Sequence, residues 1–123
     1  MELFLSRIWS GYASFNVSYH NDIHGLDVAQ MTYVILEAGL RVKAALSPLD
    51  CIAVIVAGVC HDFRHDGFTN PWHIQKKSIR FLEHGEVGTQ EKFHFAESWD
   101  VLCKTKLLDN LDPDQGNLFK RRM

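Results

Sequence analysis

The order of apolar and polar residues along the chain follows the three- and four-residue spacing of amphipathic helices. From Asp27 the apolar positions repeat at this spacing, and Gly39 stands where such a helix would end. The apolar positions are Val28, Met31, Val34, Ile35 and Ala38. This pattern predicts an amphipathic helix over residues 25–38.

A second helix is predicted over residues 48–60. Ser47, Pro48 and Asp50 supply an N-cap, a first-turn proline and an acidic third position, and together they favour a helix start. The residues that follow are apolar all round and rich in β-branched side chains, so their periodicity also allows a buried strand. The capping residues decide in favour of a helix.

A third helix is predicted after the loop that Gly85 and Gly88 bracket. Thr89 is expected to cap this helix, which should end near Leu108. Its apolar side is predicted to hold Phe95, Trp99 and Leu102. The helix therefore spans most of the chain between the loop and the C-terminal segment.

A last helix is predicted to begin at residue 113, because Asp112, Pro113 and Gln115 again form an N-cap, a first-position proline and a third-position amide. Leu118 and Phe119 on it are expected to lack a partner surface, as they would if the chain were truncated at its C-terminus inside an element. Every identified element is helical, so the fold class is predicted to be all-α. Residues 1–123 are expected to form the front part of one larger domain.

Composition narrows the range of partners. The chain has 46% hydrophobic and 23% charged residues, which is typical of a globular protein. Lys and Arg number 13 against 15 Asp and Glu, so no broad positive field is available for a phosphate backbone and nucleic acid is not expected as a partner. The one basic run, at residues 120–122, is interpreted as a solvated helix face.

The cysteines and the apolar runs predict a cytoplasmic protein without a membrane span. Cys51, Cys60 and Cys103 are odd in number and show no CxxC spacing, which favours a reducing compartment. The N-terminus has no signal-peptide pattern. The apolar run over residues 51–60 is half the length that a membrane span needs.

Histidines supply the candidate chemistry. Four of the seven form two pairs with four-residue spacing, His20 with His24 and His61 with His65. On a helix, residues four apart project from the same face, so each pair can address one centre. Asp62 follows the buried helix directly, where a carboxylate needs a partner, and a divalent cation is one such partner. Imidazole with carboxylate suits Zn²⁺, whereas carboxylate with water suits Mg²⁺ or Mn²⁺, so a shared Asp62 suits a mixed two-metal centre.

The remaining histidines and the tryptophans carry weaker predictions. His73 and His84 are expected to be loop or surface residues, and His94 is expected either in the core or in the outer part of the site. Packing roles are expected for Trp72 and Trp99.

Two stretches of sequence resemble the catalytic domain of class I cyclic nucleotide phosphodiesterases. Residues 19–30 read YHNDIHGLDVAQ and resemble the family's YHNxxHxxDVxQ motif, and residues 61–70 read HDFRHDGFTN and resemble its HDxxHxGxxN motif. A third stretch, EKFHFAE at residues 91–97, is similar to the family's ENHHxAE stretch but departs from it at Lys92 and Phe93.

The resemblance implies a role for each matching residue. His20 would be the general acid for the leaving oxygen, and His24, His61 and Asp62 would bind metal, with Asp62 bridging two ions. The ions would be Zn²⁺ and Mg²⁺ or Mn²⁺. The residues that the resemblance places near the bridging water and along the wall of the site are His65, Asn70 and Glu91.

The resemblance also implies the activity, which is metal-dependent hydrolysis of 3′,5′-cyclic nucleotides, cAMP or cGMP or both, to 5′-nucleoside monophosphates. A further metal-binding aspartate and a purine-binding glutamine are expected downstream, so the 123 residues alone are expected to be inactive. The alternatives are a catalytically silent regulatory or interaction fragment and another HD-type metal phosphohydrolase. The second of these would not be expected to show both motifs together. The sequence specifies neither regulatory domains nor an oligomeric state.

Overall fold

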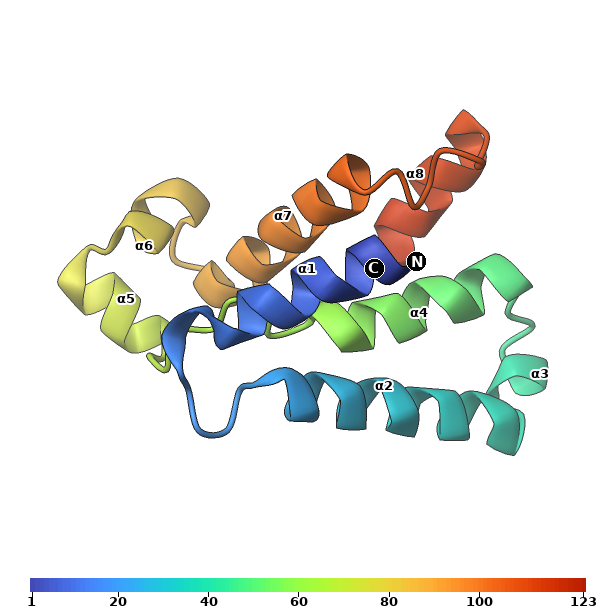
Figure 1. Cartoon of the computed structure of the whole chain (residues 1–123), viewed down its shortest axis with the longest axis horizontal. Coiled ribbons are helices and arrows are strands. Elements are labelled where there is room, and N and C mark those ends of the chain that lie inside the picture. The colour runs from blue at the N-terminus through green and yellow to red at the C-terminus, as the bar shows by residue number, and fades with distance from the viewer.

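The computed structural model describes all 123 residues, and helices joined by loops make up the whole fold (Figure 1). No strand occurs, so the all-α prediction is confirmed. The elements are α1 (Glu2–Tyr12), the 3₁₀ turn η1 (Ala13–Phe15), α2 (Asp22–Ile35), the π-type turn η2 (Leu36–Leu40), α3 (Arg41–Lys43), α4 (Pro48–Cys60), α5 (Asn70–Lys76), α6 (Ile79–His84), α7 (Thr89–Lys104) and α8 (Pro113–Arg122).

Helix α1 was not predicted from the sequence, yet it supplies much of the core. Its buried side chains Phe4, Ile8 and Tyr12 are four residues apart and therefore lie on one face. In addition, the Tyr12 hydroxyl donates a hydrogen bond to the Val59 carbonyl of α4 at 2.9 Å. The core consists of Phe4, Ile8, Tyr12, Ala53, Val56, Cys60, Phe63, Leu102 and Phe119, from α1, α4, α7, α8 and the segment after α4.

Helices α2 and α4 lie side by side and antiparallel, so the start of α2 meets the end of α4 (Figure 1). Their contact is close, because a methyl group built on Gly58 would lie 3.2 Å from Ala29 Cα. Gly25 and Ala29 are the buried residues of α2. Ala29 and Gly58 therefore form the close contact between α2 and α4, since larger side chains would hold the two backbones apart. Gly25 instead faces Tyr12 of α1, because a methyl group built on it would lie 2.9 Å from the Tyr12 hydroxyl oxygen.

The predicted helix over residues 25–38 is confirmed as a helix, but its boundaries and its buried face differ from the prediction. It begins at Asp22, where the Asn21 side chain accepts a hydrogen bond from the His24 backbone N–H, and Gly39 (φ 116°) interrupts it before α3. The predicted apolar face is wrong for three large residues that are about half exposed, Met31, Val34 and Ile35. The buried positions belong to Ala29, which packs on Gly58 of α4, and to Gly25, which faces Tyr12 of α1.

Helices α4 and α8 begin where the sequence predicts. Both have the expected capping box and a first-turn proline, at Ser47 with Asp50 and at Asp112 with Gln115. The prediction that Phe119 lacks a partner surface is wrong, because its side chain is 1% exposed in the core. The basic run is also not wholly solvated, since Arg122 Nε lies 2.6 Å from Asp50 Oδ1.

Helix α7 starts as predicted but ends earlier, at Lys104 rather than near Leu108. Thr89 is its first helical residue and Gly88, in the left-handed conformation (φ 67°), is the N-cap, so the predicted Thr89 cap is wrong. The Thr89 hydroxyl instead donates to the Gly85 carbonyl.

The polar stretch before α7 forms two short helices, α5 and α6, which the sequence reading did not identify. The expectation of a surface position for His73 is wrong. His73 is 1% exposed, and its ring nitrogens lie within hydrogen-bond distance of Ser78 and Asp66. None of the helices combines the length and apolar character that crossing a bilayer requires.

Candidate metal centre

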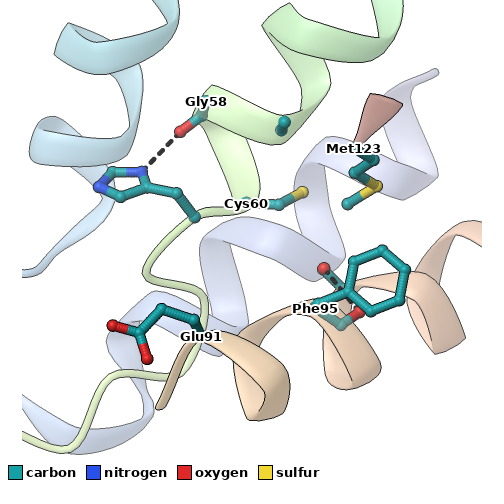
Figure 2. Close-up of a pocket in the computed structure, with 8 residues that line it drawn as sticks. Gly58, Cys60, Glu91, Phe95 and Met123 are labelled. Atoms are coloured by element: carbon teal, nitrogen blue, oxygen red, sulfur yellow. Dashed lines mark hydrogen bonds between the residues drawn. The ribbon is translucent and has the colours of Figure 1, made fainter. Parts of the chain in front are cut away.

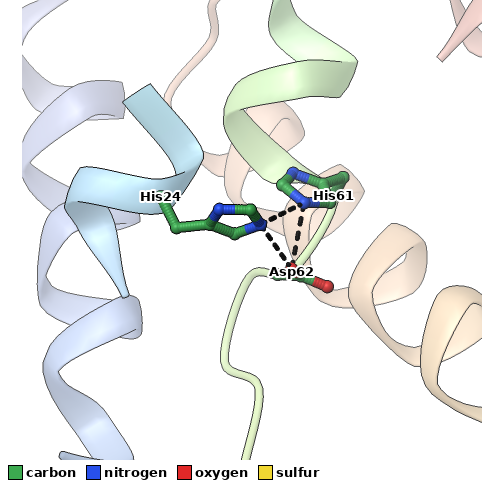
Figure 3. A group of neighbouring side chains, drawn as sticks. All are labelled: His24, His61 and Asp62. Atoms are coloured by element: carbon green, nitrogen blue, oxygen red, sulfur yellow. Dashed lines mark hydrogen bonds and ion pairs between the residues drawn. The ribbon is translucent and has the colours of Figure 1, made fainter. Parts of the chain in front are cut away.

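Three predicted metal ligands meet where α2 begins and α4 ends. His24 lies in the first turn of α2, and His61 and Asp62 directly follow Cys60, the last residue of α4 (Figure 3). The His24 and His61 Nε2 atoms are 3.2 Å apart, and they lie 3.3 Å and 2.9 Å from Asp62 Oδ2. The close pairing of α2 and α4 thus brings together residues from two separate motifs.

The proton positions of His61 show why this group suits a cation. Its Nδ1 lies 2.8 Å from the Gly58 carbonyl oxygen, which can only accept, so Nδ1 carries a proton (Figure 2). In neutral His61 the Nε2 lone pair then faces the Asp62 carboxylate. The hydrogen bond with Asp62 accordingly raises the pKa of His61, since a positive charge is favoured there.

Asp62 stays ionised in this setting. Burial opposes the charged form of its carboxylate, but the hydrogen bond that His61 donates in its protonated form and the positive charge of neighbouring histidines outweigh burial and lower its pKa to about 2. Converging acceptors around an ionised carboxylate are the donor set that a divalent cation takes. His24, His61 and Asp62 therefore form a group that could hold a metal ion.

His20 lies beside this group without joining it. Its Nε2 is 4.0 Å from Asp62 Oδ2, its ring stacks on His65 with centroids 3.9 Å apart, and its side chain is 34% exposed. His20 borders a hollow of about 310 Å³ in which Phe68 is the one hydrophobic lining residue. The other residues that line the hollow are Asp62, His65, Gly67, Phe68, Thr69, Asn70, Gln90, Glu91 and His94.

His94 of α7 presents a buried nitrogen without a partner. Its Nδ1 donates to the Phe63 carbonyl at 2.7 Å, so Nε2 carries a lone pair in the neutral ring. This Nε2 is buried, makes no hydrogen bond and lies 4.0 Å from Asp62 Oδ1. Burial lowers the pKa of His94 to about 4, which keeps the ring neutral. Two acceptors that face each other in this way fit a cation or a water molecule between them.

His65 is the third member of a second possible ligand group with Asp62 and His94. Its Nδ1 accepts a hydrogen bond from the Gly67 N–H at 2.9 Å, so its neutral ring carries the proton on Nε2. Burial, followed by the nearby charge of His20, lowers the pKa of His65. The ring is therefore placed to donate a hydrogen bond into the hollow.

Asn70 and Glu91 form one wall of the hollow. The Asn70 side chain donates to Glu91 Oε2 at 2.9 Å and accepts from the Gln90 N–H at 2.8 Å. The hydrogen bond from Asn70 lowers the pKa of Glu91, so the wall is negatively charged. All seven residues that the resemblance singled out thus lie at or beside the same hollow.

The sequence did not predict two further features of the site. Gln90 lines the hollow, and no motif marked it. A second cavity of about 310 Å³ shares Glu91 with the hollow and is lined by residues that include Cys60, Phe95 and Met123 (Figure 2). Burial raises the pKa of the Cys60 thiol to about 12, so this cavity presents no reactive thiolate.

The fold and the site together define an all-helical chain in which His and Asp side chains from the start of one helix and the end of another form a possible metal site. Comparison with known sequences specifies the family. The sequence model described as 3′5′-cyclic nucleotide phosphodiesterase matches residues 19–123, and the chain belongs to that family. The resemblance seen in the two motifs is thereby confirmed.

Individual curated relatives carry the same family description. A human dual specificity calcium/calmodulin-dependent 3′,5′-cyclic nucleotide phosphodiesterase 1B is 34% identical over 100 residues, which cover 80% of this chain and 18% of the relative. The 3′,5′-cyclic-nucleotide phosphodiesterase regA of Dictyostelium discoideum is 29% identical over 108 residues, covering 86% of this chain and 14% of that protein. The chain thus spans less than a fifth of the length of these relatives.

Proposed function

We propose that this chain provides the metal-binding part of an enzyme that hydrolyses 3′,5′-cyclic nucleotides to 5′-nucleoside monophosphates. The observation that carries the proposal is the convergence of His24, His61 and Asp62 beside His20 at a polar hollow. Membership of the cyclic nucleotide phosphodiesterase family supports it. The relatives' names specify a cyclic nucleotide as the substrate of those proteins, and we propose the same substrate class here.

His24, His61 and Asp62 would hold one divalent cation, for which His nitrogen with carboxylate favours Zn²⁺. The other oxygen of Asp62 faces His94 Nε2 and would serve a second cation, Mg²⁺ or Mn²⁺. When bound, the two cations would neutralise charge on the phosphoryl oxygens and make hydroxide available near neutral pH. The unpartnered His94 nitrogen fits this arrangement, because it can accept from a water molecule there.

His20 would supply the proton for the leaving group. As the bond between phosphorus and the ribose 3′-oxygen breaks and a water oxygen bonds to phosphorus, the 3′-oxygen gains negative charge and must be protonated. The His20 ring reaches the hollow but lies 4.0 Å from Asp62 Oδ2, which leaves its Nε2 available to the substrate. An imidazole near pH 7 can both hold and release the proton.

His65, Asn70 and Glu91 would order the water and substrate in the hollow. His65 can donate from Nε2, and Glu91 accepts from Asn70 and remains an anion that favours donors. These groups would orient a reacting water molecule relative to phosphorus, and orientation of this kind is a large part of hydrolytic catalysis.

Two substitutions in the intact protein test these assignments. His20→Ala should lower kcat for cyclic nucleotide hydrolysis by roughly 10²- to 10⁴-fold while metal content, measured by elemental analysis, stays near that of the wild type. His61→Ala should lose metal and activity together. His84→Ala, on α6 and outside the hollow, is the matched control and should change neither. Equal loss of metal in the His20 and His61 variants would refute the separation of roles.

A further inference from the structure

The segment over residues 61–70 carries Asp62, His65 and Asn70 but has almost no regular secondary structure. Its backbone polar groups therefore need partners outside a helix. One residue in it, Arg64, has a positive φ of 60°, which is strained for a residue with a side chain. The conformation of this segment has to be maintained by contacts from neighbouring elements.

Two side chains from the neighbouring helices bind adjacent carbonyls of the segment. His94 of α7 donates to the Phe63 carbonyl at 2.7 Å, and Arg80 of α6 donates from Nη2 to the Arg64 carbonyl at 2.9 Å. Both carbonyls lie within two residues of Asp62. Arg80 therefore acts at the strained residue itself, on the side of the segment that faces α6.

Arg80 also binds the segment a second time. Its Nη2 lies 3.3 Å from Asp66 Oδ2, and its Nη1 donates to Gln90 Oε1. Gln90 in turn donates to Asp66 Oδ1 at 3.2 Å and to the Phe68 carbonyl at 2.9 Å. The result is a closed set of hydrogen bonds that joins α6, α7 and both halves of the segment.

The position of Arg80 is fixed from the other face as well. Arg80 is only 8% exposed, and the central carbon of its guanidinium lies 3.8 Å from the centroid of the Phe93 ring. This geometry is that of a cation–π contact, which is stronger when it is desolvated. Phe93 is one of the two positions at which the third motif departs from the family pattern. The aromatic ring thus supports the guanidinium that holds the segment.

We propose that Arg80 is a positioning residue of the candidate metal centre, holding the segment that carries Asp62 and His65 in ligand geometry. This proposal rests on the proposed function for its metal-binding consequence, but the hold on the segment is independent of any ion. Arg80 does not itself line the hollow, and it makes no hydrogen bond or ion pair with His24, His61 or Asp62, although it donates to Gln90, which does line the hollow. It acts through the Arg64 carbonyl and the Asp66 carboxylate.

The first test uses amide hydrogen exchange in the metal-free chain. Arg80→Met keeps the unbranched apolar stem and removes every donor, and Arg121→Met, on the exposed face of α8, is the matched control. In the Arg80 variant, the amides of His65 and Gly67, which are hydrogen-bonded within the segment, should exchange at least about tenfold faster. Amides inside α4 should keep their rates. Unchanged rates in the segment would overturn the proposal, as would a uniform acceleration over the whole chain.

The second test measures Co²⁺ binding by visible absorption. Arg80→Met should weaken Co²⁺ binding by about 10- to 100-fold and alter the absorption bands of the bound ion, because residues that orient ligands affect both. Equal affinity with an identical spectrum would overturn the proposal. If the wild-type chain bound no Co²⁺, the proposed function would fail, and the exchange rates would still decide whether Arg80 holds the segment.

Discussion

The buried, neutral His94 makes the free energy of unfolding depend on pH in a predictable direction. Burial lowers the pKa of His94 to about 4 in the folded chain, whereas an unfolded histidine titrates near 6.5. The folded state therefore binds fewer protons than the unfolded state between these two values. The stabilisation is complete above about pH 6.5 and is lost progressively as the pH falls towards 4.

The size of the effect follows from the two pKa values. A difference of about 2.5 pKa units corresponds to about 3 kcal/mol at most, and between pH 7 and pH 5.5 the loss from this one group is about 1 kcal/mol. His65, whose pKa burial also lowers, contributes with the same sign, and His61 contributes with the opposite sign because its hydrogen bond with Asp62 raises its pKa. A variant that removes only the His94 titration is needed to isolate the contribution.

His94→Asn serves this purpose, because its amide can still donate a hydrogen bond towards the Phe63 carbonyl and does not titrate. Urea unfolding of the metal-free wild type and of the variant, each at pH 7 and at pH 5.5, gives a free energy of unfolding for each protein at each pH. The wild type should lose about 1 kcal/mol more than the variant between the two pH values. A difference between wild type and variant that is the same at both pH values would refute the reasoning.

Two further substitutions test the packing and capping that place the site. Gly11→Ala should lower the free energy of unfolding by about 1–2 kcal/mol, because the added methyl would lie 2.0 Å from Phe63 Cε2 and the strain exceeds the gain in helix propensity; unchanged stability in urea unfolding would contradict this. Ser47→Ala removes the acceptor for the Asp50 N–H and should cost about 1 kcal/mol by the same assay, with the exposed Ser6→Ala as control. Equal effects of the two serine variants would argue against the cap.

Features set by local sequence could be predicted well. The starts of α4 and α8 depend on a capping residue, a proline and a third-position side chain that are adjacent in sequence, so the pattern specifies them. The grouping of His24 with His61 and Asp62 could be anticipated only through the family motifs. Nothing in the spacing alone shows that the start of one helix meets the end of another.

Features set by tertiary contact could not be predicted. Periodicity favoured Met31 and Val34 as the buried face of α2, but the close approach of α2 to α4 requires a small residue, and Ala29 takes the buried position. The burial of His73 and Arg80 depends on partners at Asp66 and Gln90, which lie in separate segments. From the sequence alone, polar residues of this kind are predicted to be exposed to solvent, because their hydrogen-bond partners are distant along the chain.

The antiparallel pairing of α2 and α4 also has a consequence for metal affinity. His24 and His61 are separated by 37 residues along the chain, yet the packing of α2 on α4 holds their Nε2 atoms 3.2 Å apart. Closing a loop of that length costs an unfolded chain about 4 kcal/mol in conformational entropy. Because helix packing supplies this closure, a cation would meet the two imidazoles at high effective concentration. The folded hairpin should therefore bind the ion roughly 10²- to 10³-fold more tightly than the same residues on a flexible chain.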